Sequence, residues 1–316
     1  MSSGGSVMMK VYYNAIMRNF LLPAYLAERF PLGQFVPLSL AVVGSAAFVG
    51  ALSLAVSPRP YMLFPAGLAF LLFLFRLRLL DEVKDAAHDK VHYPHRPLAR
   101  GVVSESWVKR MVVTTLFGEL VIALSFDAFV FALFLFALLY SFVMYKEFFV
   151  PEVLRRRFVA YVILHEVLSL PLFLYIYALL GIFVGRFTPP ILLLLGMQAG
   201  GLFALEIARK LRRTEGKNNA GDTYPEHLGV FGATVSCGAL FALSGICVLA
   251  VAHSARDVFP AFAVMTALLA AVLAWALGTF ARAKDVASAK KVFLSGAIFV
   301  LLPQIVLATL YLNRAL

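Results

Sequence analysis

Residues 61–101 read YMLFPAGLAF LLFLFRLRLL DEVKDAAHDK VHYPHRPLAR G, an apolar run that passes directly into a stretch rich in acids, prolines and arginines. The apolar run, 61–80, has the length of roughly 20 residues that a helix needs to cross the hydrocarbon core of a bilayer. The polar stretch begins with Asp81 and Glu82, where that span would end. This junction predicts a membrane-spanning helix with a polar site at the membrane surface.

The rest of the chain has the composition of a membrane protein. Its 316 residues are 62% hydrophobic and only 14% charged, with a mean hydropathy of +0.88, whereas soluble domains are about a quarter charged. So few charges cannot cover a soluble globule of this size. We therefore expect an all-α integral membrane protein, one domain over 1–316, with nine transmembrane helices at 37–56, 61–80, 108–126, 128–145, 158–183, 189–208, 228–252, 259–280 and 292–312.

The basic residues support this count and give an orientation. If the N-terminus is cytoplasmic, 24 of the 28 Lys and Arg residues fall on the cytoplasmic side and 4 on the other. This bias is the positive-inside rule, and an omitted or invented span would scramble it. The formal charge of +11 then faces anionic lipid headgroups or an anionic substrate. We expect a multi-pass protein of the cell (inner) membrane, with the lipid bilayer and no nucleic acid as a partner.

The acids that follow the span at 61–80 have helical spacing. Glu82, Asp85 and Asp89 stand at i, i+3 and i+7, on one stripe of a helix, and Asp81 borders that stripe. Carboxylates this close repel one another unless a cation lies between them, and hard oxygen ligands suit Mg²⁺. A solvated acidic helix end, relieved by neighbouring lysines, explains the acids alone equally well.

The residues after the acids favour a ligand site. Pro94, Pro97 and Gly101 are expected to end the helix and fix a turn, which directs Arg96 and Arg100 back toward the acidic stripe. Acids, a metal ion and arginine together are how proteins hold a diphosphate.

Residues 81–101 resemble the first aspartate-rich motif of the UbiA superfamily of membrane prenyltransferases. In that family the motif usually runs Asn-Asp-x-x-Asp-x-x-x-Asp, followed by His-Pro-x-Arg-Pro-Leu-x-x-Gly. Here Asp81 and Glu82 replace the first two residues and Tyr93 replaces the His. The matching positions are Asp85, Asp89, Pro94, Arg96, Pro97, Leu98 and Gly101. The resemblance covers the whole chain, because the family is a bundle of nine helices with motifs in the cytoplasmic cap loops 2–3 and 6–7.

The resemblance implies Mg²⁺ as a cofactor and a prenyl diphosphate as the donor. The catalytic residues would be Asp85, Asp89 and Arg96, the metal ligands of this motif Asp81, Glu82, Asp85 and Asp89, and the diphosphate-binding residues Arg96, Arg100 and Lys146. Lys146 lies at the end of the fourth span, where the family places a basic residue near the diphosphate. A lysine that only snorkels to the membrane interface would look the same.

The second motif departs further from the family, which usually has another acidic run there. Glu206 stands at the first acidic position, and basic residues that include Arg209 and Lys210 stand where the second acid belongs. Asp222 could supply the missing carboxylate, so that Glu206 and Asp222 are candidate metal ligands. Alternatively, Arg209 and Lys210 bind the diphosphate directly. Simple positive-inside anchoring and an ordinary turn residue explain the same positions.

The function we expect is Mg²⁺-dependent transfer of an isoprenoid group from a prenyl diphosphate to an acceptor, with an aromatic acceptor as the first candidate. A terpene cyclase of the same superfamily, which needs no acceptor, is one alternative. A multi-helix transporter or permease is another, but the acids gather in cytoplasmic loops rather than near the bilayer midplane, where transporter sites lie. We assign no catalytic role to Glu119, His165 or Glu166, which fall inside predicted spans.

Overall fold

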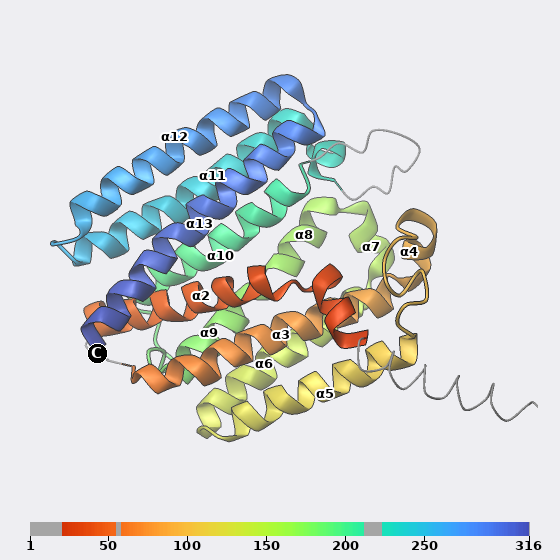
Figure 1. Cartoon of the computed structure of the whole chain (residues 1–316), viewed down its shortest axis with the longest axis horizontal. Coiled ribbons are helices and arrows are strands. Elements are labelled where there is room, and N and C mark those ends of the chain that lie inside the picture. The colour runs from red at the N-terminus through yellow and green to blue at the C-terminus, as the bar shows by residue number, and fades with distance from the viewer. Residues whose placement is uncertain (1–20, 55–57, 212–222, 316) are drawn as a thin grey trace, which may run out of the picture. The chain divides into compact units, whose positions relative to one another are not determined.

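The computed structural model describes residues 21–54, 58–211 and 223–315, and these residues form helices joined by short connections (Figure 1). A helical segment at residues 21–29 comes first. The labelled elements are α2 Leu32–Ser53, η1 Pro60–Met62, α3 Leu63–Lys84, α4 Ala86–His92, α5 Glu105–Leu124, α6 Ala128–Tyr145, η2 Glu147–Phe149, α7 Pro151–Arg156, α8 Phe158–Glu166, α9 Ser169–Leu179, α10 Pro189–Arg209, α11 Tyr224–Ser254, α12 Phe259–Ala283 and α13 Val286–Ala315.

Eight helical segments of the described residues are long and apolar enough to cross a membrane. They coincide with eight of the nine predicted spans. The remaining prediction, 108–126, coincides with the 20-residue helix α5. That helix carries Lys109, Arg110 and Glu119, and is therefore less apolar than the others. The prediction of an all-α, multi-pass membrane protein is confirmed, with nine as an approximate number of spans.

Several helix ends differ from the prediction, for local reasons. The predicted span 158–183 contains α8 and α9, which form one helical segment, Phe158–Leu179, because Val167 and Leu168 between them keep right-handed helical backbone angles. A short helical turn precedes the predicted span of α11, and it begins with a capping box in which the Glu226 carboxylate accepts a hydrogen bond from the Thr223 N–H at 3.2 Å. Gly229, with φ 68° and ψ 164°, separates this turn from the rest of α11. Helix α13 also begins early, because the Asp285 carboxylate accepts a hydrogen bond from the Ser288 N–H at 2.7 Å.

The chain divides into two compact units, which we describe separately. The described part of the first unit comprises residues 21–37 and 71–121. Its core is a cluster of fully buried side chains, Tyr25, Leu79, Val103 and Val108, surrounded by partly buried apolar and aromatic residues. This cluster joins the helical segment at 21–29 to the end of α3 and the start of α5 within one unit.

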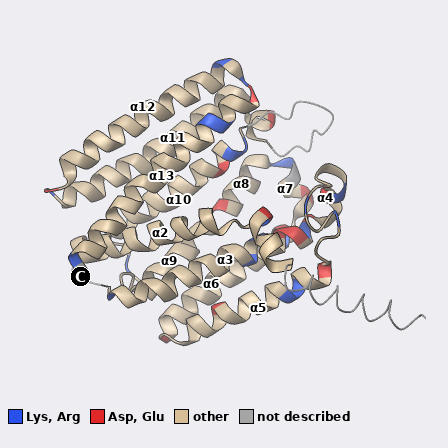
Figure 2. Cartoon of the chain, in the orientation of Figure 1, with Lys and Arg blue, Asp and Glu red and all other residues tan. Residues whose placement is uncertain are grey.

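The second unit comprises residues 38–70 and 122–316. Helices α10 to α13 lie side by side in it (Figure 1), and charged residues gather at the ends of these helices rather than along their lengths (Figure 2). Small residues allow the close approach: a Cβ on Gly44 would lie 2.4 Å from Ala308 Cβ, and one on Gly296 would lie 2.4 Å from the Phe241 ring. Such small-residue contacts are typical of helix packing in membranes.

A buried polar network connects four helices of this unit. The Gln198 amide on α10 donates to Val42 O at 2.9 Å and to Ser45 Oγ at 3.0 Å, both on α2. Its carbonyl oxygen accepts from the Tyr177 hydroxyl on α9 at 2.8 Å. Gln304 on α13 is 3.4 Å from Ser45 Oγ. These polar groups are buried, so water cannot bind them, and the hydrogen bonds of the network supply the partners that they need.

Candidate functional site

The acids of the first motif lie at the junction of α3 and α4, in the first unit. Helix α3 ends at Lys84 and α4 begins at Ala86. Asp85, between them, has φ −91° and ψ 4°. Helical hydrogen bonding continues across the junction, because the Asp85 N–H donates to Asp81 O and the Asp89 N–H donates to Asp85 O, each at 2.8 Å. The acids therefore keep a helical spacing through a local bend.

The two most buried acids of the first motif each have cationic partners. Glu82 is 1% exposed. It forms an ion pair with Arg29, and its Oε1 is 3.6 Å from Arg78 Nη2. Asp89 is 3% exposed, and its Oδ1 accepts a hydrogen bond from Arg96 Nη1 at 2.5 Å. In pairs of this kind, cations and hydrogen bonds compensate a buried carboxylate for the loss of water.

The loop after α4 holds Arg96 beside Asp89. The Arg96 N–H donates to Tyr93 O at 3.0 Å, and the guanidinium lies 4.1 Å from the centre of the Tyr93 ring. Gly101 has a φ of +77°, a left-handed conformation that favours glycine, and the turn beginning at Pro97 closes there. The turn that the sequence predicts after the acids is present, and it brings Arg96 to the acidic stripe.

Asp81 and Asp85 are half-buried. Burial raises the pKa of the Asp85 carboxyl above its usual range; Asp89 adds to the rise, while Lys84 and Arg96 oppose it. A carboxyl in this environment is strongly stabilised in its charged form by a nearby cation.

The donor set of this unit suits Mg²⁺. Over the described residues, no three His, Cys, Asp or Glu side chains are already assembled as a metal-binding group. Mg²⁺, however, is usually bound through one or two carboxylates, with water and substrate phosphates completing the shell. Glu82 Oε2 is buried and makes no hydrogen bond within the described structure. Glu82, Asp85 and Asp89 could therefore hold Mg²⁺, with Asp81 at the margin.

The helical segment at 21–29 contributes residues that sequence reasoning did not assign to the site. Arg29 pairs with Glu82, and Glu28 pairs with the exposed guanidinium of Arg100. The sequence interpretation counted Arg29 only toward the charge bias of the cytoplasmic side. No local spacing links it to Glu82, since the two lie 53 residues apart in the chain.

The acid and the bases of the second motif pair with one another in the second unit. Glu206 accepts hydrogen bonds from Arg209 Nε at 2.9 Å and Arg209 Nη2 at 2.8 Å, and Lys210 Nζ lies 3.0 Å from Glu206 Oε1. These are i,i+3 and i,i+4 contacts at the end of one helix. Asp222, the other predicted acid, lies outside the described residues.

Glu166, the last residue of α8, lies close to this pair. The carboxyls of Glu166 and Glu206 interact electrostatically. At the preceding residue, His165 Nδ1 is 2.8 Å from Tyr161 O, and the centres of the His165 and Tyr161 rings are 4.0 Å apart. Glu166 lies inside a continuous helical segment, as the sequence predicts, but no local spacing in the sequence indicates that it would lie near Glu206.

Lys146 follows the last residue of α6. Its ammonium group lies 5.3 Å from the centre of the Tyr145 ring. The next three residues, Glu147 to Phe149, have φ values of 48°, 54° and 59°. Left-handed conformations in non-glycine residues cost energy and occur preferentially near functional sites. The lysine is thus held beside a strained turn.

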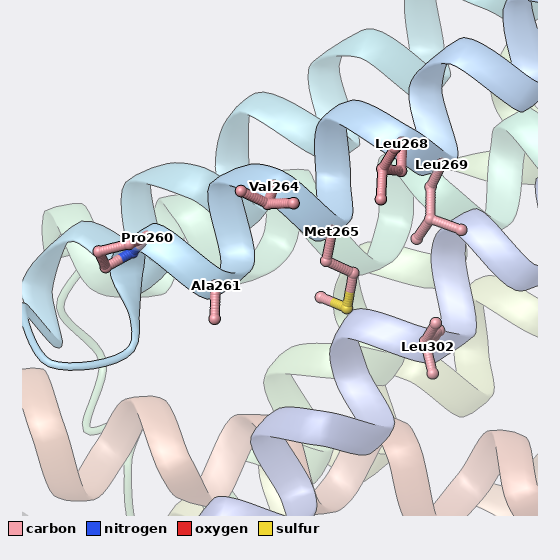
Figure 3. A pocket seen from close by; sticks show the side chains of 7 residues that line it. All are labelled: Pro260, Ala261, Val264, Met265, Leu268, Leu269 and Leu302. Carbon is pink, nitrogen blue, oxygen red and sulfur yellow. The ribbon is translucent and has the colours of Figure 1, made fainter.

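An open groove of about 690 Å³ lies between α12 and α13 (Figure 3), lined by Pro260, Ala261, Val264, Met265, Leu268, Leu269 and Leu302. Its lining is apolar and includes none of the predicted site residues. The groove provides no group for acid–base, metal or anion chemistry.

The family model described as the UbiA prenyltransferase family matches residues 37–299, which include the acids and arginines at the α3–α4 junction and the Glu206 pair. The chain belongs to the UbiA prenyltransferase family. A comparison with curated proteins gives no match.

Solved structures of UbiA proteins have the same fold. An apo UbiA homologue from Aeropyrum pernix K1 aligns with a TM-score of 0.63 and 13% identity, over 88% of this chain and 97% of that one. A UbiA homologue from Archaeoglobus fulgidus gives 0.55 and 15%, over 90% and 99%. A structure concerning digeranylgeranylglyceryl phosphate synthase in membranes gives 0.56 and 16%, over 91% and 98%. At these identities the likeness concerns the fold.

Proposed function

We propose that this UbiA-family protein is a Mg²⁺-dependent intramembrane prenyltransferase that moves an isoprenoid group from a prenyl diphosphate to an acceptor, with an aromatic ring as the first candidate. The observation that supports it best is the arrangement at the α3–α4 junction. There the buried carboxylates of Glu82 and Asp89 flank Asp85, and a loop arginine, Arg96, is held against Asp89.

The residues of this unit have distinct roles in the proposal. Mg²⁺ held by Glu82, Asp85 and Asp89 would supply positive charge that offsets the charge of the diphosphate. Arg96 and Arg100 bind the remaining phosphate oxygens through charge-assisted hydrogen bonds. Arg96 already forms an ion pair with Asp89, so its side chain lies beside the acids, whereas Arg100 is paired with Glu28 of the segment at 21–29.

Transfer of the isoprenoid group depends on positive charge that stabilises the leaving diphosphate and on the exclusion of water from the reacting carbon. Cleavage of the C–O bond releases diphosphate, which keeps the electron pair, and leaves an allylic cation on the isoprenoid. Apolar helices shield that cation from water until a carbon of the acceptor ring attacks it. Loss of a proton from that carbon restores the aromatic ring.

The second motif has a proposed part as well. Glu206, with Asp222, is the candidate for a second metal-binding pair, and Arg209, Lys210 and Lys146 are the candidates for binding phosphate. In the structure, Arg209 and Lys210 both form ion pairs with Glu206. A cation bound at Glu206 would release both side chains for a phosphate group.

We also propose that the protein lies in the cell (inner) membrane with its N-terminus in the cytoplasm. The support is the placement of 24 of 28 Lys and Arg residues on that side.

The experiment is a screen of purified protein against prenyl diphosphates of increasing chain length, with and without aromatic acceptors. Diphosphate release and product mass are both measured. A transferase releases diphosphate and yields a product heavier than the acceptor by the prenyl group, and Asp85→Ala abolishes Mg²⁺-dependent turnover while the protein stays folded. Diphosphate release with a cyclic product and no acceptor would identify a terpene cyclase. Full activity of Asp85→Ala, or no diphosphate release from any donor, would overturn the proposal.

A further inference from the structure

The helical segment at residues 21–29 makes two ion pairs with the rest of its unit. Arg29 is paired with Glu82, and Glu28 is paired with Arg100. Glu82 is one of the acids proposed to hold Mg²⁺, and Arg100 is one of the arginines proposed to bind diphosphate. The segment therefore engages one residue of each kind.

Aromatic contacts hold the same segment in place. Tyr25 is fully buried, and its ring centre lies 5.5 Å from that of Trp107 and 6.2 Å from that of Phe75. Phe30, directly after the segment, is 2% exposed and lies 5.2 Å from Phe75. The apolar side of the segment therefore packs against aromatic side chains, while its polar side forms the two ion pairs.

Among the described residues, two of the residues that pack or pair in the docked arrangement each have a buried polar atom without a hydrogen bond. These atoms are the Tyr25 hydroxyl oxygen and Glu82 Oε2. Buried polar atoms without partners destabilise the state that contains them. Apolar packing thus stabilises the docked segment, while the buried polar atoms without hydrogen bonds destabilise it. Because these two contributions oppose each other, a ligand that binds only the undocked state can displace the segment.

We propose that the segment at 21–29 is an autoinhibitory lid on the diphosphate site, which docks through Arg29 and Glu28 and is released when Mg²⁺ and a diphosphate take Glu82 and Arg100. The inference rests on the proposed function of that site. A Glu82 carboxylate bound to a divalent ion no longer needs Arg29, and an Arg100 guanidinium bound to phosphate no longer needs Glu28. Because only the undocked protein binds the ligand, weakening the docked state raises the undocked fraction and strengthens ligand binding until the segment is fully released.

Tryptophan fluorescence can follow the segment directly. The chain has two tryptophans, Trp107 and Trp275, so Trp275→Phe leaves Trp107 as the sole reporter beside Tyr25. In this background the probe is Mg²⁺ with inorganic diphosphate. Trp107 emission and diphosphate binding by isothermal titration are measured together. We expect the Trp107 emission to shift to longer wavelength as diphosphate binds, because release of Tyr25 exposes the indole to a more polar environment.

Two variants open the lid from different sides. Glu28→Gln breaks the exposed pair with Arg100 and leaves the acids untouched, so its folding is not at risk. Arg29→Gln breaks the pair with Glu82. Arg29→Gln should bind Mg²⁺ and diphosphate about five- to twenty-fold more tightly than the parent, and Glu28→Gln, whose pair is exposed, about two- to fivefold more tightly. The ligand-free Trp107 emission of both variants should shift toward that of the liganded parent. Asp257→Asn, which breaks an exposed pair with Arg314 in the other unit, should change neither quantity.

The outcomes separate the lid from the proposed function. Equal diphosphate binding in the parent and in both variants overturns the lid alone, and so does binding without any change in Trp107 emission. Weaker binding in Arg29→Gln would make Arg29 a ligand-binding residue and would also overturn the lid. If neither the parent nor any variant binds diphosphate with Mg²⁺, the proposed function fails and the lid fails with it.

Discussion

Asp89→Asn changes one charge at the centre of the first motif and keeps the shape of the side chain. In the structure Asp89 is 3% exposed and its Oδ1 is 2.5 Å from Arg96 Nη1. A hydrogen bond to a charged group stabilises a fold by about 1.5–3 kcal/mol. The Arg96 side chain is 22% exposed and lies over the Tyr93 ring, so it can regain water and keep that contact. We therefore expect the free energy of unfolding to fall by only about 1–2 kcal/mol.

The effect on catalysis should be larger than the effect on folding. Removing one group that stabilises the reacting charge typically slows an enzyme about 10²- to 10³-fold, which corresponds to roughly 2.7–4 kcal/mol of barrier. Diphosphate release is measured under saturating donor at several Mg²⁺ concentrations, beside thermal unfolding in the same detergent. Asp257→Asn is the matched control, because its carboxylate is 2.9 Å from Arg314 but 66% exposed. It should change stability by less than about 1 kcal/mol and leave the rate intact.

Two results would refute this reasoning. If Asp89→Asn retains the parent rate, the carboxylate is not part of the reacting site. If the rate falls only as far as the folded fraction falls, the pair with Arg96 is structural.

Three further predictions concern stability and are checked by thermal unfolding in detergent. Gln198→Leu removes three hydrogen bonds of the buried network and should cost about 2 kcal/mol, since hydrogen bonds inside membrane proteins average roughly 0.6 kcal/mol each; an unchanged midpoint would show that the network adds nothing. Gly296→Ala places a Cβ 2.4 Å from a phenylalanine ring and should cost about 1–3 kcal/mol, whereas Gly278→Ala, with open space around it, should cost nothing. Glu119→Gln deprives Arg76 of a buried partner at 2.9 Å and should cost about 3 kcal/mol, while replacing both by Leu and Met should recover most of that loss; equal loss in the single and double variants would contradict this.

Much of the fold could be predicted because a single physical signal governs it. A helix must be apolar over some 20 residues to cross a bilayer, and the runs of the sequence show this directly. The prediction was less accurate where a side chain decides the local backbone. The capping box at Thr223 adds a short helical turn before the span of α11, and Gly229 separates the two.

The contacts of the candidate site also divide into those that the sequence predicts and those that it does not. Asp85, Asp89 and Arg96 lie within one short stretch, so helix spacing and two prolines were sufficient to place them near one another. Arg29 meets Glu82 across 53 residues, and the packing of Tyr25 and its apolar neighbours brings them together. No periodicity in the sequence encodes such a contact. In the second motif the sequence indicated Glu206 and the bases, but not that they would pair with each other.

The most direct test of the central claim is a titration of Mn²⁺, as a paramagnetic substitute for Mg²⁺, into purified protein with and without inorganic diphosphate. Free and bound ion are counted by electron paramagnetic resonance. The account predicts that diphosphate strengthens ion binding by the parent protein and that Asp85→Ala loses this binding while remaining folded. Equal ion binding by the two proteins, or no binding by the parent with diphosphate present, would contradict it.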